Sequence, residues 1–265
     1  MNSFGKNFNM DKIQIIILAA GHGRRMNNES LPKVLTSLKG KPLIIWLAEA
    51  IKKSGVCERP VIVVGQKSEM IKATLGQDYT YVTQSEQLGT GHAVMVARTE
   101  LEGKAENIMV LYGDHPLVSS ETIKKLTQAH LDSGNVLTMA TVKIEDFNDW
   151  RKSFSDFGRI TRASDGTISA IIEAKDATID QKNILEVNPS YFVFKADWLW
   201  QNLAKLKSDN VQHEYYLTDL PKIAVSENEK ITSVEIDPRE ALGVNTVNQL
   251  NSLIAIFNLN FDFCL

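Results

Sequence analysis

The chain has 265 residues with 29 basic and 32 acidic side chains, which gives a net charge of −3. Its length suits one domain with an elaborated edge, and 43% hydrophobic with 23% charged residues excludes a disordered, collagen-like or disulfide-built chain. The near balance of charge argues against nucleic-acid binding. The two cysteines, Cys57 and Cys264, form no zinc or disulfide pattern, so a reducing compartment fits.

The N-terminal residues carry no pattern of an ordered element. Residues 1–9 are polar, are predicted to be a disordered lead-in, and leave Met10 as an alternative start to Met1. The apolar run Ile13–Ala20 is too short to span a bilayer and lacks the flanks of a signal peptide. We therefore expect a cytoplasmic protein without a membrane span.

The first half alternates between strand and helix patterns. Strands are predicted at Ile13–Ala19, Pro60–Val64, Tyr79–Thr83, Ile108–Tyr112 and Val136–Thr141. Helices are predicted at Pro42–Ser54, Lys67–Leu75, His92–Glu100 and Glu121–Ser133. Because several of these strands are apolar throughout, they suit a parallel sheet covered on both faces. The pattern predicts a doubly wound α/β fold with a mostly parallel, Rossmann-like sheet and helices on both faces.

After Thr141 the regular alternation of strand and helix patterns ends. Short alternating runs at Gly158–Arg162, Ile168–Glu173 and Tyr191–Lys195 predict a small antiparallel patch that leans on the first half. Further elements are predicted as helices at Ala196–Leu206 and Leu220–Ser226 and a strand at Lys230–Ile236. No repeat or linker divides the chain, so residues 10–250 are predicted to form one domain.

A glycine loop follows the first strand. Gly21 and Gly23 allow backbone N–H groups to approach an anion, while Arg25 and Lys33 supply positive charge. The same glycines could serve only to make a tight turn. A dinucleotide fingerprint would need glycine in place of Met26, and the chain has no Gly-Lys-Ser/Thr ending of a P-loop, so both of those readings fail.

Six colinear strings carry a family resemblance. They are Leu18–Met26 with Leu31–Leu35, Gln84–Ala93, Leu111–Asp114, Phe157–Thr161, Glu214–Asp219 and Gly243–Asn245. In order and spacing they resemble the uridyltransferase domain of the bacterial bifunctional N-acetylglucosamine-1-phosphate uridyltransferases, which are sugar-phosphate nucleotidyltransferases. The resemblance covers roughly Lys12 to Leu250 and implies a nucleotide-diphospho-sugar transferase fold.

That resemblance implies a reaction and its residues. UTP and N-acetylglucosamine 1-phosphate would give UDP-N-acetylglucosamine and pyrophosphate, with Mg²⁺ as cofactor. Arg25 and Lys33 are the implied catalytic residues, and Asp114 and Asn245 the implied metal ligands. The implied nucleotide contacts are Leu18, Ala20, Gly21, Gly23, Gln84, Gly89 and Thr90, and the implied sugar contacts are Tyr112, Gly158, Glu173, Asn188, Tyr216 and Thr218.

Most of these residues have a plainer alternative role. Asp114 could cap the following helix and Asn245 the last helix, because both residue types are common N-caps. For Asn245 the capping and metal-binding roles could coexist. Gln84 alone would be read as a surface residue, and Glu173 as an exposed acid at a strand end. His92 is predicted to open a helix, and Trp198 with Trp200 to pack in the interior.

The chain departs from the family pattern on the sugar side. Asn188-Pro189-Ser190 stands where the family usually has Asn-Thr-Gly, and His213 stands where glycine usually precedes the Glu-Tyr-Tyr string. In the glycine loop, His22 and Arg24 replace the usual lysine and threonine or serine. The pattern therefore leaves open another sugar 1-phosphate, another nucleoside triphosphate, or a binding module without turnover.

The C-terminal segment is the last feature. We expect no acetyltransferase activity, since the chain ends about twenty residues after Asn245 without hexapeptide repeats. Residues 251–265 are instead apolar, and we expect this segment to pack on the domain or on a second subunit as a homo-oligomer contact.

Overall fold

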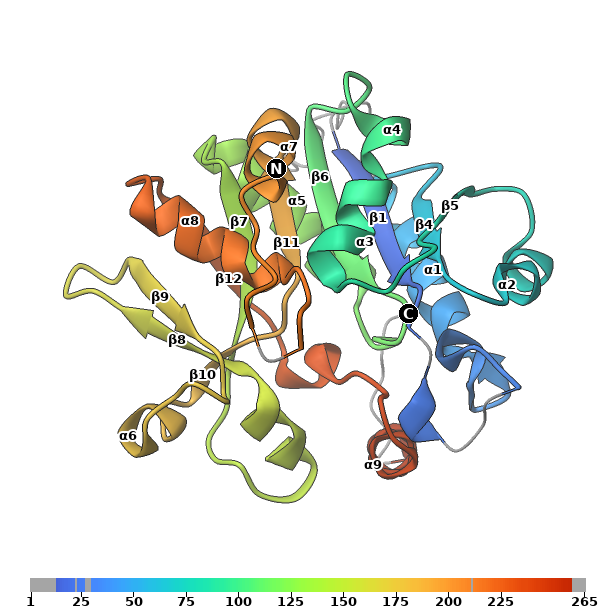
Figure 1. Ribbon diagram of the computed structural model, residues 1–265. Coiled ribbons are helices and arrows are strands. Elements are labelled where there is room, and N and C mark those ends of the chain that lie inside the picture. The colour runs from blue at the N-terminus through green and yellow to red at the C-terminus, as the bar shows by residue number, and fades with distance from the viewer. Residues whose placement is uncertain (1–12, 22, 27–29, 211, 259–265) are drawn as a thin grey trace, which may run out of the picture.

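The computed structural model describes residues 13–21, 23–26, 30–210 and 212–258, so the predicted lead-in of residues 1–9 lies outside it (Figure 1). Ten strands of these residues form one sheet. Along the sheet the strands are β5 (Thr80–Thr83), β4 (Val61–Val64), β1 (Ile13–Ala19), β6 (Asn107–Tyr112), β11 (Phe192–Lys195), β7 (Leu137–Lys143), β10 (Glu186–Asn188), β8 (Gly158–Arg162) and β9 (Ile168–Ile172), and β12 (Ile231–Glu235) pairs with β7. A separate ribbon joins β2 (Ser37–Leu38) and β3 (Lys41–Pro42).

Helices connect and cover the strands. The α-helices are α1 (Leu43–Ser54), α2 (Ser68–Leu75), α3 (Thr90–Val96), α4 (Arg98–Leu101), α5 (Ser120–Ser133), α6 (Ile179–Lys182), α7 (Ala196–Leu203), α8 (Leu220–Ser226) and α9 (Val247–Asn258). Short 3₁₀ turns are η2 (Arg24–Met26), η3 (Lys33–Leu35), η4 (Asp149–Asp156), η5 (Leu217–Asp219) and η6 (Pro238–Ala241). The predicted helix at His92–Glu100 is thus divided into α3 and α4.

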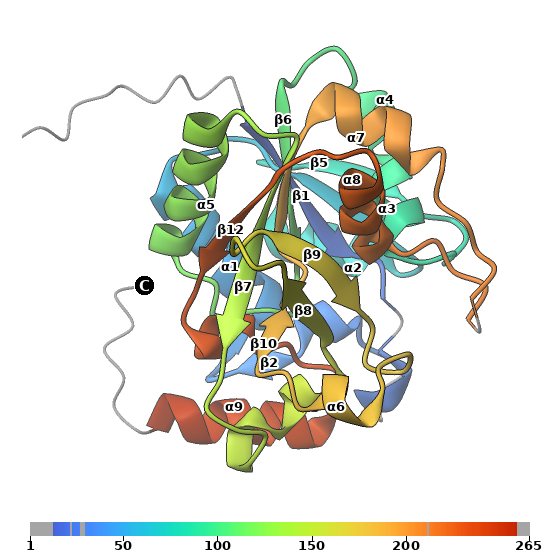
Figure 2. The same ribbon diagram turned by 90° about the vertical axis from the view of Figure 1, so that its left-hand side faces the viewer.

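The predicted parallel sheet is confirmed for β5, β4, β1 and β6, which all pair in parallel. The side chains of strand β1 show why the sheet needs a layer of helices on each face. Ile15 and Ile17 pack with α1 and α5, whereas Ile16 and Leu18 pack with α3, α7 and α8. Figure 2 shows α1 and α5 on one side of the sheet and α3, α7 and α8 on the other. Side chains that alternate between two apolar layers explain the uninterrupted apolar sequence.

The position of β11 corrects the prediction for the second half. Tyr191–Lys195 was predicted in the small antiparallel patch, but β11 lies in the middle of the main sheet, antiparallel to both β6 and β7. The physical reason is that Phe192, Val193 and Phe194 are all fully buried, which requires cover on both faces. Consequently β7 is not the next neighbour of β6; it pairs with β11 and, in parallel, with β12.

The antiparallel lobe is formed by β8, β9 and β10. It joins the main sheet because β7 is long enough to pair with β11 at one end and with β10 at the other. In Figure 1 this lobe, with α6, extends away from the central strands. The two cavities described below are lined by residues outside this lobe.

The C-terminal helix α9 packs on the domain. Leu253 and Ile256 are buried in the core, and the Phe257 ring lies 5.4 Å from that of Trp46. Residues 259–265 of the predicted apolar segment lie outside the described residues. No helix in the described ranges has both the length and the apolar character to cross a bilayer.

Candidate active site

Two adjoining cavities lie at the carboxyl ends of the parallel strands, where α/β sheets bind ligands. The first, of about 350 Å³, is lined by Leu18, Ala19, Ala20, Gly21, Lys33, Val34, Gln84, Gln87, Gly89, Thr90, Ala93, Tyr112, Asp114, His115, Glu214 and Asn245. The second, of about 570 Å³, is lined by Gly21, Gly23, Arg25, Lys33, Gln87, Glu214 and Asn245. The structure therefore brings together the predicted catalytic, metal and nucleotide residues.

The glycine loop wraps around the base of Lys33. Gly23 has a φ of +64°, and a Cβ there would lie 2.8 Å from the Cβ of Lys33. Glycine is therefore needed for close approach as well as for the turn. Met26, buried at the end of η2, anchors the loop, and Val34 and Leu35 anchor η3. This packing fixes the backbone of Lys33 and leaves its side chain to reach the cavity.

Lys33 joins the two predicted metal ligands. Its Nζ lies 2.5 Å from Asp114 Oδ2 and 2.7 Å from Asn245 Oδ1. Asp114 follows β6, whereas Asn245 comes from a loop more than 130 residues later that is held by a hydrogen bond from Val244 N to the Asp114 carbonyl. Two oxygen atoms from distant segments thus converge on one cationic group.

The capping alternatives for these two residues are wrong. Helix α5 is capped by Ser119, whose hydroxyl accepts from Thr122 N, so Asp114 is not needed there. At α9 the Thr246 hydroxyl accepts from Gln249 N. The Asn245 side chain is therefore available to the cavity, and its backbone N–H donates to Gln249 Oε1. Both side chains face Lys33 instead of a helix terminus.

The charge of Asp114 depends on Lys33. Burial by itself would raise the pKa of this carboxyl group, but the neighbouring Lys33 ammonium, with a smaller contribution from His115, outweighs burial and lowers the pKa below its usual range. Asp114 is thus an anion at neutral pH, although only 6% of the residue is exposed.

His115 sits between the two oxygen-bearing loops and was not predicted. Burial lowers the pKa of His115, the Asp114 carboxylate acts against this change, and Lys33 adds to it. The Tyr191 hydroxyl donates to the Glu240 carbonyl at 2.8 Å and therefore accepts from His115 Nδ1 at 2.6 Å. The remaining nitrogen, Nε2, is directed at Gly243, where a Cβ would lie only 2.3 Å away.

Gln84 forms one wall of the first cavity. It follows β5 and is 4% exposed, so its reading as a surface residue is wrong. Its amide nitrogen donates to the Gly89 carbonyl and to His92 Nδ1, both at 3.1 Å. Both amide hydrogens are used in this way, which leaves the carbonyl oxygen Oε1 for a ligand. His92 lies in the first turn of α3 as predicted, and it also orients Gln84.

Beside Gln84, the segment Gln84–Ala93 is hydrogen-bonded to the segment Glu214–Asp219. Gly91 N donates to the Tyr215 carbonyl and Tyr215 N donates to the Leu88 carbonyl, each at 2.7 Å. Gly89 has a φ of +101°, and a Cβ there would lie 2.6 Å from the Tyr215 carbonyl oxygen. The Thr90 hydroxyl accepts from Leu217 N at 3.0 Å, so Thr90 lines the cavity while holding this junction.

Three predicted sugar residues cluster in the antiparallel lobe. Asn188 on β10 pairs with Gly158 on β8, and Glu173 follows β9. A Cβ on Gly158 would lie 3.6 Å from Glu173 Oε1, which places this carboxylate beside the open face of the glycine. The cluster lies in the lobe, apart from the two cavities, whose described lining includes Tyr112 alone of the predicted sugar residues.

The departures from the family pattern lie at special backbone positions. Ser190 has a φ of +66° and His213 a φ of +53°, a conformation that favours glycine. Ser190 N donates to Asn188 Oδ1 at 2.8 Å, so this turn needs no N–H from Pro189. The Ser190 hydroxyl also hydrogen-bonds Tyr112, whose pKa is raised, chiefly by burial. The substitutions thus preserve the backbone path and add a hydroxyl group beside Tyr112.

The remaining two predicted sugar residues, Tyr216 and Thr218, lie outside this cluster. The Tyr216 hydroxyl donates to Gln212 Oε1. Burial raises the pKa of Tyr216, and Glu214 and Glu173 add to this change. Thr218 lies on η5, which packs against α3. No contact of Thr218 with the sugar cluster is found among the described residues.

Sequence reasoning missed three polar residues of the cavities. Gln87, His115 and Glu214 line them, and Gln87 donates to the Ala20 carbonyl. Gln87 and Glu214 belong to strings that were recognised but were given no role. His115 directly follows Asp114, which was the signal available for it.

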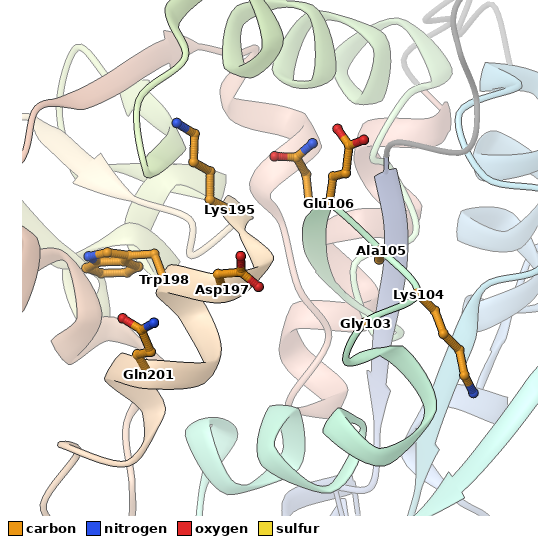
Figure 3. A pocket seen from close by; sticks show the side chains of 9 residues that line it. Gly103, Lys104, Ala105, Glu106, Lys195, Asp197, Trp198 and Gln201 are labelled. Carbon is orange, nitrogen blue, oxygen red and sulfur yellow. The ribbon is translucent and has the colours of Figure 1, made fainter.

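A third cavity lies at the amino end of the central strand β6, opposite to the two site cavities (Figure 3), and contains no predicted site residue. It is bordered by Lys104, Glu106, Lys195, Asp197, Trp198 and Gln201. Trp198 stacks on Phe194 with ring centroids 6.2 Å apart, and Trp200 is 2% exposed. Their predicted packing role is confirmed.

Comparison with known proteins shows the family of the chain. Residues 15–214 match the family model described as MobA-like NTP transferase domain. A bifunctional protein GlmU from Acetivibrio thermocellus is 37% identical over 242 residues, which cover 91% of this chain and 50% of that protein. Its counterpart from Exiguobacterium sibiricum is 39% identical over 231 residues, covering 87% and 49%. The chain therefore spans about half the length of the curated relatives it matches.

Among solved structures, a UDP-glucose pyrophosphorylase complexed with UDP-glucose matches with a TM-score of 0.72. The match covers 94% of this chain and all of that chain at 18% identity. At this identity the likeness concerns the fold, and it supports the predicted nucleotide-diphospho-sugar transferase architecture.

Proposed function

Because this chain belongs to the family of MobA-like NTP transferase domains, we propose that it makes UDP-N-acetylglucosamine and pyrophosphate from UTP and N-acetylglucosamine 1-phosphate. The observation that carries this proposal is the convergence of the Asp114 and Asn245 oxygens on Lys33 in the lining of the first cavity. The similarity to proteins named GlmU supports the choice of substrates.

The nucleotide base belongs beside Gln84 in this proposal. The free acceptor Oε1 suits the N3–H donor of uracil, because both amide hydrogens are engaged with Gly89 and His92. Gly89 carries no side chain, so a planar base can approach the backbone closely. The triphosphate then extends toward Gly21, Gly23 and Arg25 in the second cavity.

The reaction is a displacement at phosphorus. An oxygen of the sugar phosphate attacks the α-phosphorus of UTP, and the bond to the leaving pyrophosphate breaks. Arg25 and Lys33 line the cavity where these anions meet, and they neutralise charge as it shifts to the leaving group. Arg25 can donate two parallel hydrogen bonds, whereas Lys33 acts as a point charge.

Asp114 and Asn245 are the proposed ligands of Mg²⁺. Their oxygens already converge on one cationic group at 2.5 and 2.7 Å, and a carboxylate with a carboxamide oxygen is a hard donor pair of the kind Mg²⁺ prefers. The ion would supply charge neutralisation at the phosphates. Mg²⁺ usually keeps several waters and takes phosphate oxygens, so two protein ligands are enough for such a site.

The sugar belongs at Gly158, Glu173 and Asn188. The Glu173 carboxylate can accept from sugar hydroxyl groups. Asn188 Oδ1 is engaged with Ser190 N, which leaves its amide nitrogen as the donor for an acetamido oxygen. A reaction that uses these metabolites suits the cytoplasm.

The departures at Ser190 and His213 favour a second candidate, the same transfer with another sugar 1-phosphate. The test is kcat/KM for N-acetylglucosamine 1-phosphate and glucose 1-phosphate with UTP at fixed Mg²⁺. We expect preference for the acetylated sugar, since a site that hydrogen-bonds the acetamido group leaves polar atoms unpaired without it. Equal or reversed values would favour the second candidate, and no turnover with any sugar or nucleotide would indicate a binding module.

A further inference from the structure

Lys33 occupies the point at which the two metal-binding oxygens converge. Its ammonium group contacts Asp114 Oδ2 at 2.5 Å and Asn245 Oδ1 at 2.7 Å. The Lys33 side chain is 14% exposed and that of Asp114 is 8% exposed, so bulk water screens this ion pair little. The proposed Mg²⁺ would compete with Lys33 for the same Asn245 oxygen and for the same Asp114 carboxylate.

An ammonium group and a divalent cation cannot share these atoms. Both would lie within about 3 Å of the same Asn245 oxygen, and two positive charges at that separation repel strongly in a partly buried site. Lys33 must therefore move before a metal ion can take both ligands. The apparent affinity for the metal ion then depends on the fraction of molecules in which Lys33 is away from Asp114 and Asn245.

The Lys33 ammonium has a second position within reach, in the second cavity. The base of the side chain is clamped, because Gly23 leaves no room for even a Cβ next to the Cβ of Lys33. Its end is held by the contacts with Asp114 and Asn245, and the neighbouring Gly21 has no side chain beside Lys33 Cε. Lys33 borders both cavities, and the second is where Arg25 also lies. Rotation of the side chain can thus carry the ammonium from the carboxylate to a bound triphosphate.

We propose that Lys33 is a built-in competitor of the divalent cation, and that the triphosphate, by attracting Lys33, opens the metal site. This inference rests on the proposed function for the identity of the metal ligands. Triphosphate and metal then assist each other by the same factor, because coupling between two binding events is reciprocal. When neither ligand is bound, Lys33 pairs with Asp114, which would otherwise be an unpaired buried anion.

The direct test measures Mn²⁺ binding to the whole chain without nucleotide, by the electron paramagnetic resonance signal of free Mn²⁺ at about pH 8. We expect wild-type protein to bind weakly and Lys33→Met to bind about tenfold more tightly or better. A site that is open one-tenth of the time shows a tenfold weaker apparent affinity, and removal of the competitor restores it. Lys33→Gln is a second variant that removes the charge but retains a polar end.

The controls separate this effect from others. Lys41→Met removes a surface lysine that pairs with Glu49 at 2.6 Å, outside the cavities, and should leave Mn²⁺ binding unchanged. Asp114→Asn should abolish the binding. Thermal unfolding of each variant shows whether it is folded. Equal or weaker binding by the Lys33 variants overturns the proposal, and so does a lack of binding to every protein, because then no shared site exists.

A second measurement tests the coupling. We expect α,β-methylene-UTP to strengthen Mn²⁺ binding to wild-type protein beyond the binding of Mn²⁺ by the nucleotide alone, and this gain to shrink in Lys33→Met. An unchanged gain overturns the proposed opening. Turnover with UTP and N-acetylglucosamine 1-phosphate is measured separately. Turnover without the Mn²⁺ difference disproves the competition alone, whereas the Mn²⁺ difference without turnover on any sugar disproves the proposed function alone.

Discussion

Replacement of Gly243 by alanine tests the contact that sets the spacing between Asp114 and Asn245. The new Cβ would lie 2.3 Å from His115 Nε2 and 2.7 Å from its Cδ2, whereas ordinary contacts begin at 3.4 Å. Gly243 has no left-handed φ, so the substitution introduces a clash without backbone strain. The His115 ring, or the loop that carries Asn245, must therefore move by about 1 Å, the shortfall from ordinary contact.

The expected cost follows from what His115 holds. Its displacement breaks the buried hydrogen bond to the Tyr191 hydroxyl, worth about 1–3 kcal/mol when a buried partner is left unsatisfied. Overpacking adds about 1–3 kcal/mol, so we expect Gly243→Ala to lose about 2–6 kcal/mol of unfolding free energy. A misplacement of about 1 Å in the site can lower turnover about a hundredfold.

A double-mutant cycle provides the assay and the control. Urea unfolding and kcat are measured for Gly243→Ala, His115→Ala and the pair. Because His115→Ala removes the atoms that clash, the double variant should be more stable than the sum of the single effects predicts, by about 1–3 kcal/mol. Strictly additive effects would show that His115 and Gly243 are not in contact and would refute the spacing role.

Four further predictions concern single groups. Arg25→Ala should lower kcat about a hundredfold with an unchanged melting temperature, because it removes a donor for charge that develops on the phosphates; a wild-type kcat would remove Arg25 from the mechanism. Glu173→Gln should raise KM for the sugar phosphate while UTP binding, measured by calorimetry, stays the same, and weakened UTP binding would argue against a sugar role. Thr246→Val should cost about 1 kcal/mol in urea unfolding through loss of the α9 cap, and no loss would contradict that cap. Burial is the main reason why the pKa of His130 is lowered from 6.5 to about 4. As the pH falls from 7.5 to 5, the unfolded chain therefore binds a proton at His130 before the folded chain does, and the free energy of unfolding should fall by about 2 kcal/mol. His130→Gln should show about 2 kcal/mol less of this pH dependence, and an identical dependence of stability on pH would contradict the shift.

The parallel half of the fold could be predicted because its signal is local. A strand such as β1 alternates between two apolar layers, and that alone makes its sequence apolar throughout. The place of β11 could not be predicted in the same way. Its three buried residues call for cover on both faces, but which neighbours provide it depends on pairing with β6 and β7 over long sequence separations.

The site was predictable to the extent that motifs name residues. The glycine loop, Asp114 and Asn245 were placed together by recognised strings, and the structure joins them through Lys33. His115 escaped because its role is steric and comes from Gly243, which is more than 120 residues away. The choice between capping and ligand roles also needed the structure, since only there do Ser119 and Thr246 appear as the caps.

The late insertion of β11 has a consequence for how the protein is made. Strands β6 and β7 leave the ribosome well before Phe192. Until then β6 lacks its partner on one edge, and β7 lacks both β11 and the still later β12. At roughly 5–20 residues per second this interval lasts several seconds, during which open strand edges are prone to pair with other chains. We therefore expect nascent chains arrested before Phe192 to aggregate or to bind chaperones. Chains released beyond Asn245 should be protected from protease by a uridine nucleotide, because the last residue of the site has then been added.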